Sequence, residues 1–189
     1  MSKTTPEDVP AALIAAAEEL CAEQDPRSVQ MREIARRAGV STGLSYHYFE
    51  SRTALLGATL DSIASAIDER AATQEEPEDM AREVLEVVWE RPAFPRIIAS
   101  LVLSGMDVTE AMGDHPFLRR LIAVGSGGTV DGTTKAGLVV MTLLGTGLYG
   151  QSVNQAIGRP LDDNMILTAL QEAIRGLLGH PVPQPTKHN

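Results

Sequence analysis

The chain has 189 residues and a mass of 20.2 kDa, with 43% hydrophobic and 22% charged residues, so it is long enough to bury a core as a globular protein. Taken over the whole chain, a formal net charge of -9 and a pI near 4.9 argue against a general binder of nucleic acid or anionic membrane. The single cysteine, Cys21, excludes an intramolecular disulfide and a zinc site built from cysteines. Its apolar helical surroundings predict a buried thiol.

The sequence shows no sign of a membrane or metal partner. The most apolar run, residues 136–148, is interrupted by Thr142 and Thr146 and is shorter than the roughly 20 residues of a membrane span. His115, His180 and His188 stand apart, so no metal and no cofactor is expected. We therefore expect a soluble, cytoplasmic protein.

Helical periodicity runs along the chain and no alternating strand pattern interrupts it. Thr5, Pro6 and Asp8 are signals for a first helix that ends near Gln24. Further helices are expected near residues 31–38, 42–48, 52–72, 78–91, 93–104, 116–124, 136–157 and 163–178. The predicted fold class is all-α.

Residues 28–56 have the pattern of a helix-turn-helix unit. Gly39 suits the left-handed position that ends a helix, and Ser41 suits the N-cap of the next one. Ser51 suits the cap of the long helix that follows. Two short helices around a glycine turn within about twenty residues are typical of this motif.

The same segment carries a local positive charge. Residues 26–55 contain five arginines and two acids, a net charge of +3, so the rest of the chain carries -12. A short helix with small or polar outer side chains can enter the major groove of DNA. Polar tips suited to phosphate or sugar oxygens are present on Tyr46, His47, Tyr48 and Arg52.

This segment resembles the DNA-binding domain of the tetracycline-repressor (TetR) family of bacterial regulators over about residues 8–60. The matching residues are Ile34-Ala35, Ala38-Gly39-Val40-Ser41, Gly43, Tyr46-His47-Tyr48-Phe49, Ser51-Arg52 and Ala54-Leu55-Leu56. The resemblance implies that base edges are faced by Arg32, Thr42, Gly43 and Leu44. It implies that the phosphate backbone is held by Met31 through its backbone, Ser41, Tyr46, His47, Tyr48 and Arg52.

Two positions depart from the family pattern. Thr42 stands where the family often has Lys, which removes one possible phosphate contact. Leu44-Ser45 replaces a small or polar residue followed by an aliphatic one, so either Leu44 reaches a thymine methyl group or the helix turns to bury it. Arg36 and Arg37 are expected on a surface face, and the expected core residues are Ile34, Ala35, Val40, Phe49 and Leu55.

In the family, the region after this segment binds a small molecule and dimerises. Residues 138–153 are apolar almost all round and residues 163–178 carry an apolar stripe, so a homodimer through the helices near 136–157 and 163–178 is expected. A core position is favoured for each of the side chains that could instead line an apolar or aromatic ligand site, namely Trp89, Phe94, Leu103, Met106, Met112, Phe117, Met141 and Tyr149.

Together these features predict a DNA-binding domain over residues 1–56, a helical ligand-binding and dimerisation domain over 57–180, and a flexible tail over 181–189. The expected function is a dimeric transcriptional regulator that a small effector releases from a near-palindromic operator in double-stranded DNA. Repression is favoured over activation. A regulator controlled by a partner protein, or by no ligand, is the alternative. An enzyme is disfavoured because no catalytic constellation is present.

Overall fold

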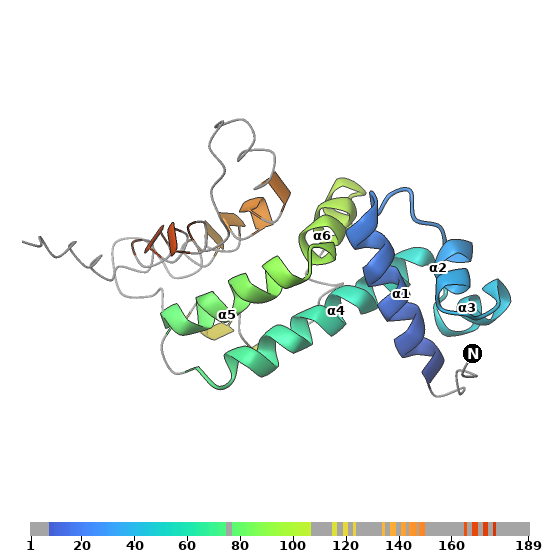
Figure 1. The fold of residues 1–189 in the computed structure, drawn as a ribbon, viewed down its shortest axis with the longest axis horizontal. Coiled ribbons are helices and arrows are strands. Elements are labelled where there is room, and N and C mark those ends of the chain that lie inside the picture. Colours follow the sequence, from blue (N-terminus) through green and yellow to red (C-terminus); the bar gives the residue numbers. More distant parts are fainter. Residues whose placement is uncertain are drawn as a thin grey trace, which may run out of the picture. The chain divides into compact units, whose positions relative to one another are not determined.

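The computed structural model describes residues 8–74 and 77–106, together with positions 115, 116, 119, 120, 123, 134, 137, 138, 141, 142, 144–146, 148, 149, 165, 168, 169, 172, 173 and 176. Its continuous helices are α1 (Val9–Glu23), α2 (Met31–Arg37), α3 (Thr42–Tyr48), α4 (Arg52–Ala71), α5 (Pro77–Glu90) and α6 (Ala93–Leu103) (Figure 1). No strand occurs among these residues. The all-α prediction is confirmed.

The predicted bounds of these six helices agree with the structure to within one residue wherever both ends were predicted. The start signals Thr5 and Pro6 lie outside the described residues, and α1 begins at Val9 with Pro10 in its first turn. Most of the three later predicted helices also lies outside them, although their described positions are helical. The tail over residues 181–189 is likewise not among the described residues.

The chain divides into two compact units. The first consists of Met1–Ala66 and Val88–His115, and the second of Ile67–Val87 and Pro116–Asn189. This division cuts α4 after Ala66 and places α6 with the helix-turn-helix segment, whereas the sequence suggested a boundary at residue 56. The division into a DNA-binding part over residues 1–56 and a ligand-binding and dimerisation part over 57–180 stays a prediction.

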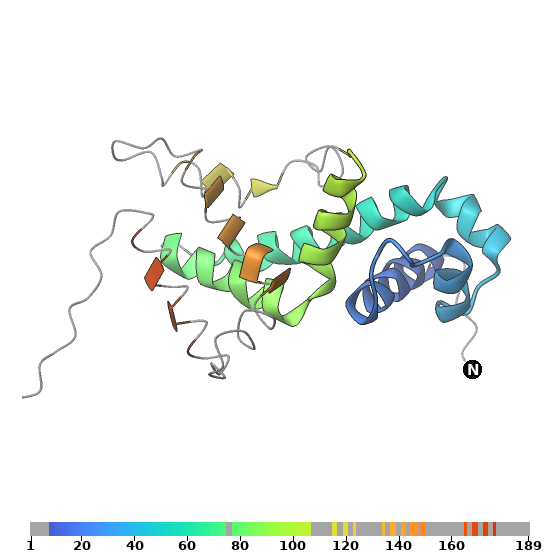
Figure 2. The ribbon, with the colours of Figure 1, turned by 90° about the horizontal axis from the view of Figure 1, so that it is seen from above.

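In the first unit, α1 packs against α2, α3 and α6, as Figures 1 and 2 show for the blue helices and the green α6. Its buried side is formed by Val9, Leu13, Ala16, Ala17, Leu20 and Cys21. Leu55, Leu56, Leu60 and Ile63 of α4 are fully buried as well. Cys21 is buried as predicted, and burial raises the pKa of its thiol to about 11.

The predicted helix caps of the helix-turn-helix segment are confirmed. Gly39 has a φ of 73°, the left-handed conformation that glycine adopts without steric cost. Ser41 Oγ accepts a hydrogen bond from the Leu44 amide at 3.1 Å, and Ser51 Oγ accepts one from the Ala54 amide at 3.0 Å. Each cap satisfies a first-turn amide and so sets the start of α3 or α4.

Two arginines, one just before α6 and one in its first turn, form polar contacts with α1. The guanidinium of Arg96 donates to the Ala22 carbonyl in the last turn of α1, and Arg91 Nε lies 3.4 Å from Glu18 Oε1. Beneath these contacts the apolar side of α6 is buried through Ala93, Phe94, Ile97 and Leu101. Arg91 and Pro92 separate α5 from α6, because a proline cannot continue the helix before it.

The second unit has a small buried group of its own, formed by Ile67, Ala71, Met80, Val84, Leu85 and Val87. Arg120 donates to the carbonyls of Ala71 and Gln74, where α4 ends and its last carbonyls lack helical partners. Within the part of the chain that the structure describes, no helix is long and apolar enough to cross a membrane.

The contact between Arg96 and Ala22 should stabilise the first unit. Arg96→Met keeps much of the apolar stem but removes a charge-assisted hydrogen bond, so we expect a loss of about 1–2 kcal/mol in the free energy of unfolding. Urea unfolding measures this. The exposed Arg36→Met is the control and should change stability by less than about 0.5 kcal/mol. Equal midpoints for the two variants would show that the contact contributes no stability.

Candidate nucleic-acid interface

Of the seven residues of α3, one is buried, one is half-buried and the other five are exposed. Ser45 has no exposed surface, and its Oγ donates to the Thr42 carbonyl at 2.7 Å. The hydroxyl is therefore satisfied inside the helix, and a small side chain lets α3 lie close to the core. Thr42, Gly43, Tyr46 and His47 are exposed. The helix thus presents small and polar groups outward on a continuous face.

The structure decides between the two orientations left open for Leu44. Its side chain is 37% exposed, so α3 is not turned to bury it. Neighbouring helical residues point about 100° apart, and burying Ser45 therefore leaves Leu44 at the edge of the exposed face. Ser45 takes the inward position, and Leu44 is available to a partner.

The other predicted site residues in α2 and α3 fall into three groups. Arg32 and Ser41 are exposed. Met31 is buried, which agrees with a role for its backbone alone. Tyr48 is half-buried, and its ring meets that of His47 edge-on at a centroid distance of 5.2 Å. Ile34, Ala35 and Leu55 are core residues as predicted, but Val40 and Phe49 are only half-buried because they border the exposed turns.

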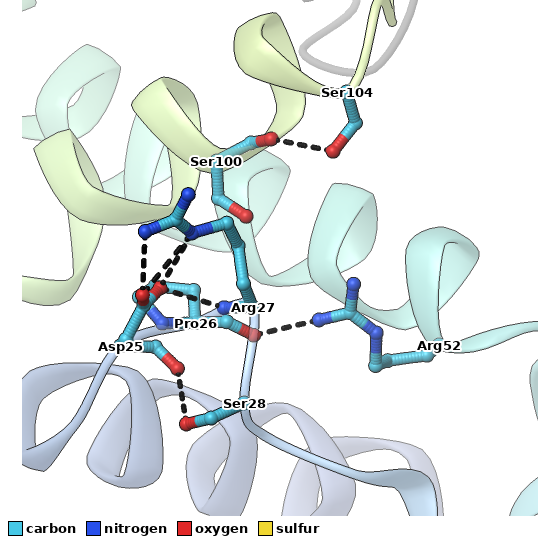
Figure 3. Close-up of polar contacts among 7 residues, drawn as sticks. All are labelled: Asp25, Pro26, Arg27, Ser28, Arg52, Ser100 and Ser104. Carbon is cyan, nitrogen blue, oxygen red and sulfur yellow. Dashed lines mark hydrogen bonds and ion pairs between the residues drawn. The ribbon is translucent and has the colours of Figure 1, made fainter.

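Arg52 makes a contact within the chain. Its Nη1 donates to the Pro26 carbonyl at 2.7 Å, which joins the start of α4 to the loop between α1 and α2 (Figure 3). In that loop Arg27 forms a forked ion pair with Asp25 at 2.8 Å, and Ser28 Oγ donates to the Asp25 carbonyl (Figure 3). The half-buried Arg52 therefore supports the loop.

Arg37 is also used within the first unit. Its Nη2 lies 2.8 Å from Glu23 Oε2 and its Nη1 3.2 Å from Glu19 Oε2, so it joins α2 to two acids one turn apart on α1. The local charge count over residues 26–55 missed these pairs because the acids precede that window. The spacing of Glu19 and Glu23 was the signal that could have revealed them.

Three of the five arginines in the segment are therefore engaged within the chain. Arg32 and Arg36 are exposed and form no ion pair with residues 8–74. They lie four residues apart, which places them on one side of α2. Like charges at this spacing disfavour the helix slightly, whereas they would attract an anion.

The predicted ligand-lining residues that the structure describes differ widely in burial. Phe94 is buried in the core, Trp89 and Met106 are half-buried, and Leu103 is 75% exposed. Met141 and Tyr149 are exposed, while Met112 and Phe117 lie outside the described residues. A hollow of about 440 Å³ in the second unit is bordered by other residues, namely Asp68, Glu69, Ala71, Ala72, Pro116 and Arg120.

Residues 13–59 match the model of the family described as bacterial regulatory proteins, tetR family. Over 116 residues the chain is 30% identical to the HTH-type transcriptional repressor Rv3405c of Mycobacterium tuberculosis. The aligned residues cover 61% of this chain and 58% of that protein. The alignment thus spans little more than half the length of this relative. Residues 13–59 of the chain therefore carry the sequence pattern of the TetR family.

Solved structures of regulators extend the likeness beyond the N-terminal domain. The putative transcriptional regulator SCO4942 from Streptomyces coelicolor has a TM-score of 0.66 at 22% identity, covering 92% of this chain and 99% of that one. BioQ from Mycobacterium smegmatis has a TM-score of 0.61 at 23% identity, covering 89% and 97%. At these identities the likeness shows that the fold is shared with these two proteins.

The ion pair between α1 and α2 makes a titration prediction. The hydrogen bond from Arg37 lowers the pKa of the Glu23 carboxyl in the folded chain. Glu23 therefore contributes stability above its unfolded pKa, and this is lost as the pH falls through the lower folded pKa. In Arg37→Gln the pKa of Glu23 should rise towards its ordinary value, as measured by NMR titration of the carboxyl carbon.

Arg27→Gln is the matched control, because it should raise the pKa of Asp25 and leave that of Glu23 unchanged. An unchanged Glu23 pKa in Arg37→Gln would contradict the pairing of α2 with α1.

Proposed function

We propose that this chain is a TetR-family transcriptional regulator that binds double-stranded DNA through α3, and that it acts as a repressor. The observation that carries the proposal is the division of α3, with Ser45 buried and a face of small and polar groups exposed. A helix of this kind can enter the major groove, where base edges are read. The similar Mycobacterium tuberculosis protein is named as a repressor, which supports the direction of control.

The exposed positions suggest how the contacts are shared. Arg32, Thr42, Gly43 and Leu44 face base edges, where hydrogen bonds and apolar contacts carry sequence information. The phosphates are contacted by the Met31 backbone and by Ser41, Tyr46, His47 and Tyr48. Arg52 stays in this group, because only its Nη1 donates to the Pro26 carbonyl and its other guanidinium N–H groups can reach a phosphate.

A homodimer follows from the apolar side chains left exposed in the predicted interface segments. These are Leu138, Met141 and Tyr149 in residues 136–157 and Met165 in residues 163–178. A two-fold dimer would cover them and place two α3 helices in successive major grooves, about 34 Å apart. The operator is then a near-palindrome.

Release by an apolar or aromatic effector requires the effector to bind two conformations with unequal affinity. The scattered burial of the candidate ligand residues leaves control by a partner protein as the second candidate, because Leu103 offers an exposed apolar contact. Both candidates keep the same DNA-binding face. The relatives reported above are named as regulators, which supports a role without catalysis.

The assignment of the arginines gives a direct test on DNA. A duplex is first selected from random-sequence DNA by the full chain, and affinity is then measured by fluorescence anisotropy at fixed salt. Arg32→Gln should weaken binding by about 1–3 kcal/mol, as for loss of an arginine that contacts a base. Arg37→Gln, whose charge is already paired on α1, should change affinity less than threefold, or about 0.6 kcal/mol. The reverse order would contradict the assignment.

A substitution at Gly43 should affect the stability of the fold and the affinity for DNA in opposite directions. A Cβ built on Gly43 meets nothing within 4 Å, so the fold does not require glycine there. Glycine costs a helix up to about 1 kcal/mol relative to alanine. Gly43→Ala should therefore stabilise the chain slightly in urea, yet weaken DNA binding about tenfold, or ~1.4 kcal/mol, because the added methyl keeps α3 from the base edges.

Gly39→Ala is the matched control for this substitution. At a φ of 73° an alanine is strained, so this variant should be less stable than the parent chain. A Gly43→Ala chain that is more stable and binds DNA with unchanged affinity would show that α3 does not approach DNA at this position.

A further inference from the structure

Leu44 is an apolar side chain at the edge of an otherwise small and polar surface. It lies between Gly43, which has no side chain, and Ser45, which fills the inward position of α3. With 37% of its surface exposed, Leu44 is used only in part by the core. The exposed remainder lies on the face of α3 that the proposed function turns towards DNA.

The chemistry of the major groove restricts what this side chain can contact. Base edges there present hydrogen-bond donors and acceptors, and the only apolar group among them is the 5-methyl of thymine. A leucine pressed against a donor or acceptor would take it from water and offer no hydrogen bond in return, which is unfavourable. A thymine methyl loses nothing in the same contact and gains burial.

Gly43 makes such a contact possible. A contact between two apolar groups requires their heavy atoms to approach within about 4 Å. Because nothing projects from the adjacent Gly43, the backbone of α3 can come near the base edges and carry the short Leu44 side chain with it. Thr42, two residues before Leu44, supplies a hydroxyl that can contact a polar base edge beside the thymine methyl.

We propose that Leu44 reads a thymine 5-methyl group in each half-site of the bound DNA. This inference rests on the proposed function and adds the identity of one base to it. Thymine at that position is favoured over cytosine, because cytosine lacks the methyl group. It is also favoured over uracil, which differs from thymine by this methyl alone.

The experiment uses the duplex that the full chain selects from random-sequence DNA. Each thymine is replaced by uracil, one position at a time, so base pairing is kept and only a methyl is removed. Burial of one methyl predicts that the parent chain binds about fourfold more weakly when one specific thymine in a half-site is replaced. Replacement in both half-sites should weaken binding about fifteenfold.

Leu44→Ala completes a double-substitution cycle. This variant should bind the thymine and uracil duplexes with equal affinity, because the side chain that senses the methyl is gone. Val102→Ala trims an exposed apolar side chain elsewhere in the first unit and should keep the full difference between thymine and uracil. The uracil duplexes test the contact even without a variant.

The outcomes separate this inference from the function beneath it. Sequence-specific selection without any sensitive thymine would overturn the role of Leu44 and leave the proposed function standing. A thymine–uracil difference that persists in Leu44→Ala would do the same and assign the methyl to another residue. Failure of the full chain to enrich any DNA sequence would overturn both.

Discussion

The packing of α1 holds the candidate DNA-binding surface together. One side of this helix is buried against α2, α3 and α6, so the direction in which α3 faces depends on it. Truncating a buried leucine such as Leu13 or Leu20 typically costs about 2–5 kcal/mol, whereas an exposed ion pair contributes about 1 kcal/mol or less. The apolar stripe therefore supplies most of the stability, and the polar contacts fix how the neighbouring helices are seated.

Those polar contacts also determine how much positive charge remains for a partner. In a chain with a formal net charge of -9, Arg37 is paired with acids on α1, Arg27 with Asp25, and Arg52 with a carbonyl. Arg32 and Arg36 remain on one side of α2. Within the proposed function, electrostatic attraction to DNA is therefore small and local. Specificity depends on shape, on the edges read by α3 and on two half-sites bound together.

The helices around the turn could be predicted because their signals are local. Gly39, Ser41 and Ser51 each act through the backbone of their own or the next few residues, and the structure confirms all three. The orientation of α3 could not be predicted, since Leu44 and Ser45 are both compatible with an inward position until the helix is packed. The partner of Arg52 depends on the path of a loop 26 residues away in sequence.

The predicted ligand site shows a different limit of sequence reasoning. Apolar side chains suit a core, a cavity and a subunit interface equally well, so composition alone cannot distinguish them. Phe94 is a core residue of the first unit, whereas Leu103, only nine residues later on the same helix, is mostly exposed. Their roles depend on which face of α6 meets α1, and that is a property of the fold.

In the proposed function, the exposed face of α3 meets DNA and α1 supports it from the buried side. Amide chemical shifts of the ¹⁵N-labelled full chain, recorded while its selected duplex is added, test this most directly. We expect the largest changes at Thr42, Gly43 and Leu44, with further changes near Arg32 and little change along the buried side of α1. Large changes confined to the second unit, with α3 unaffected, would contradict the proposed function.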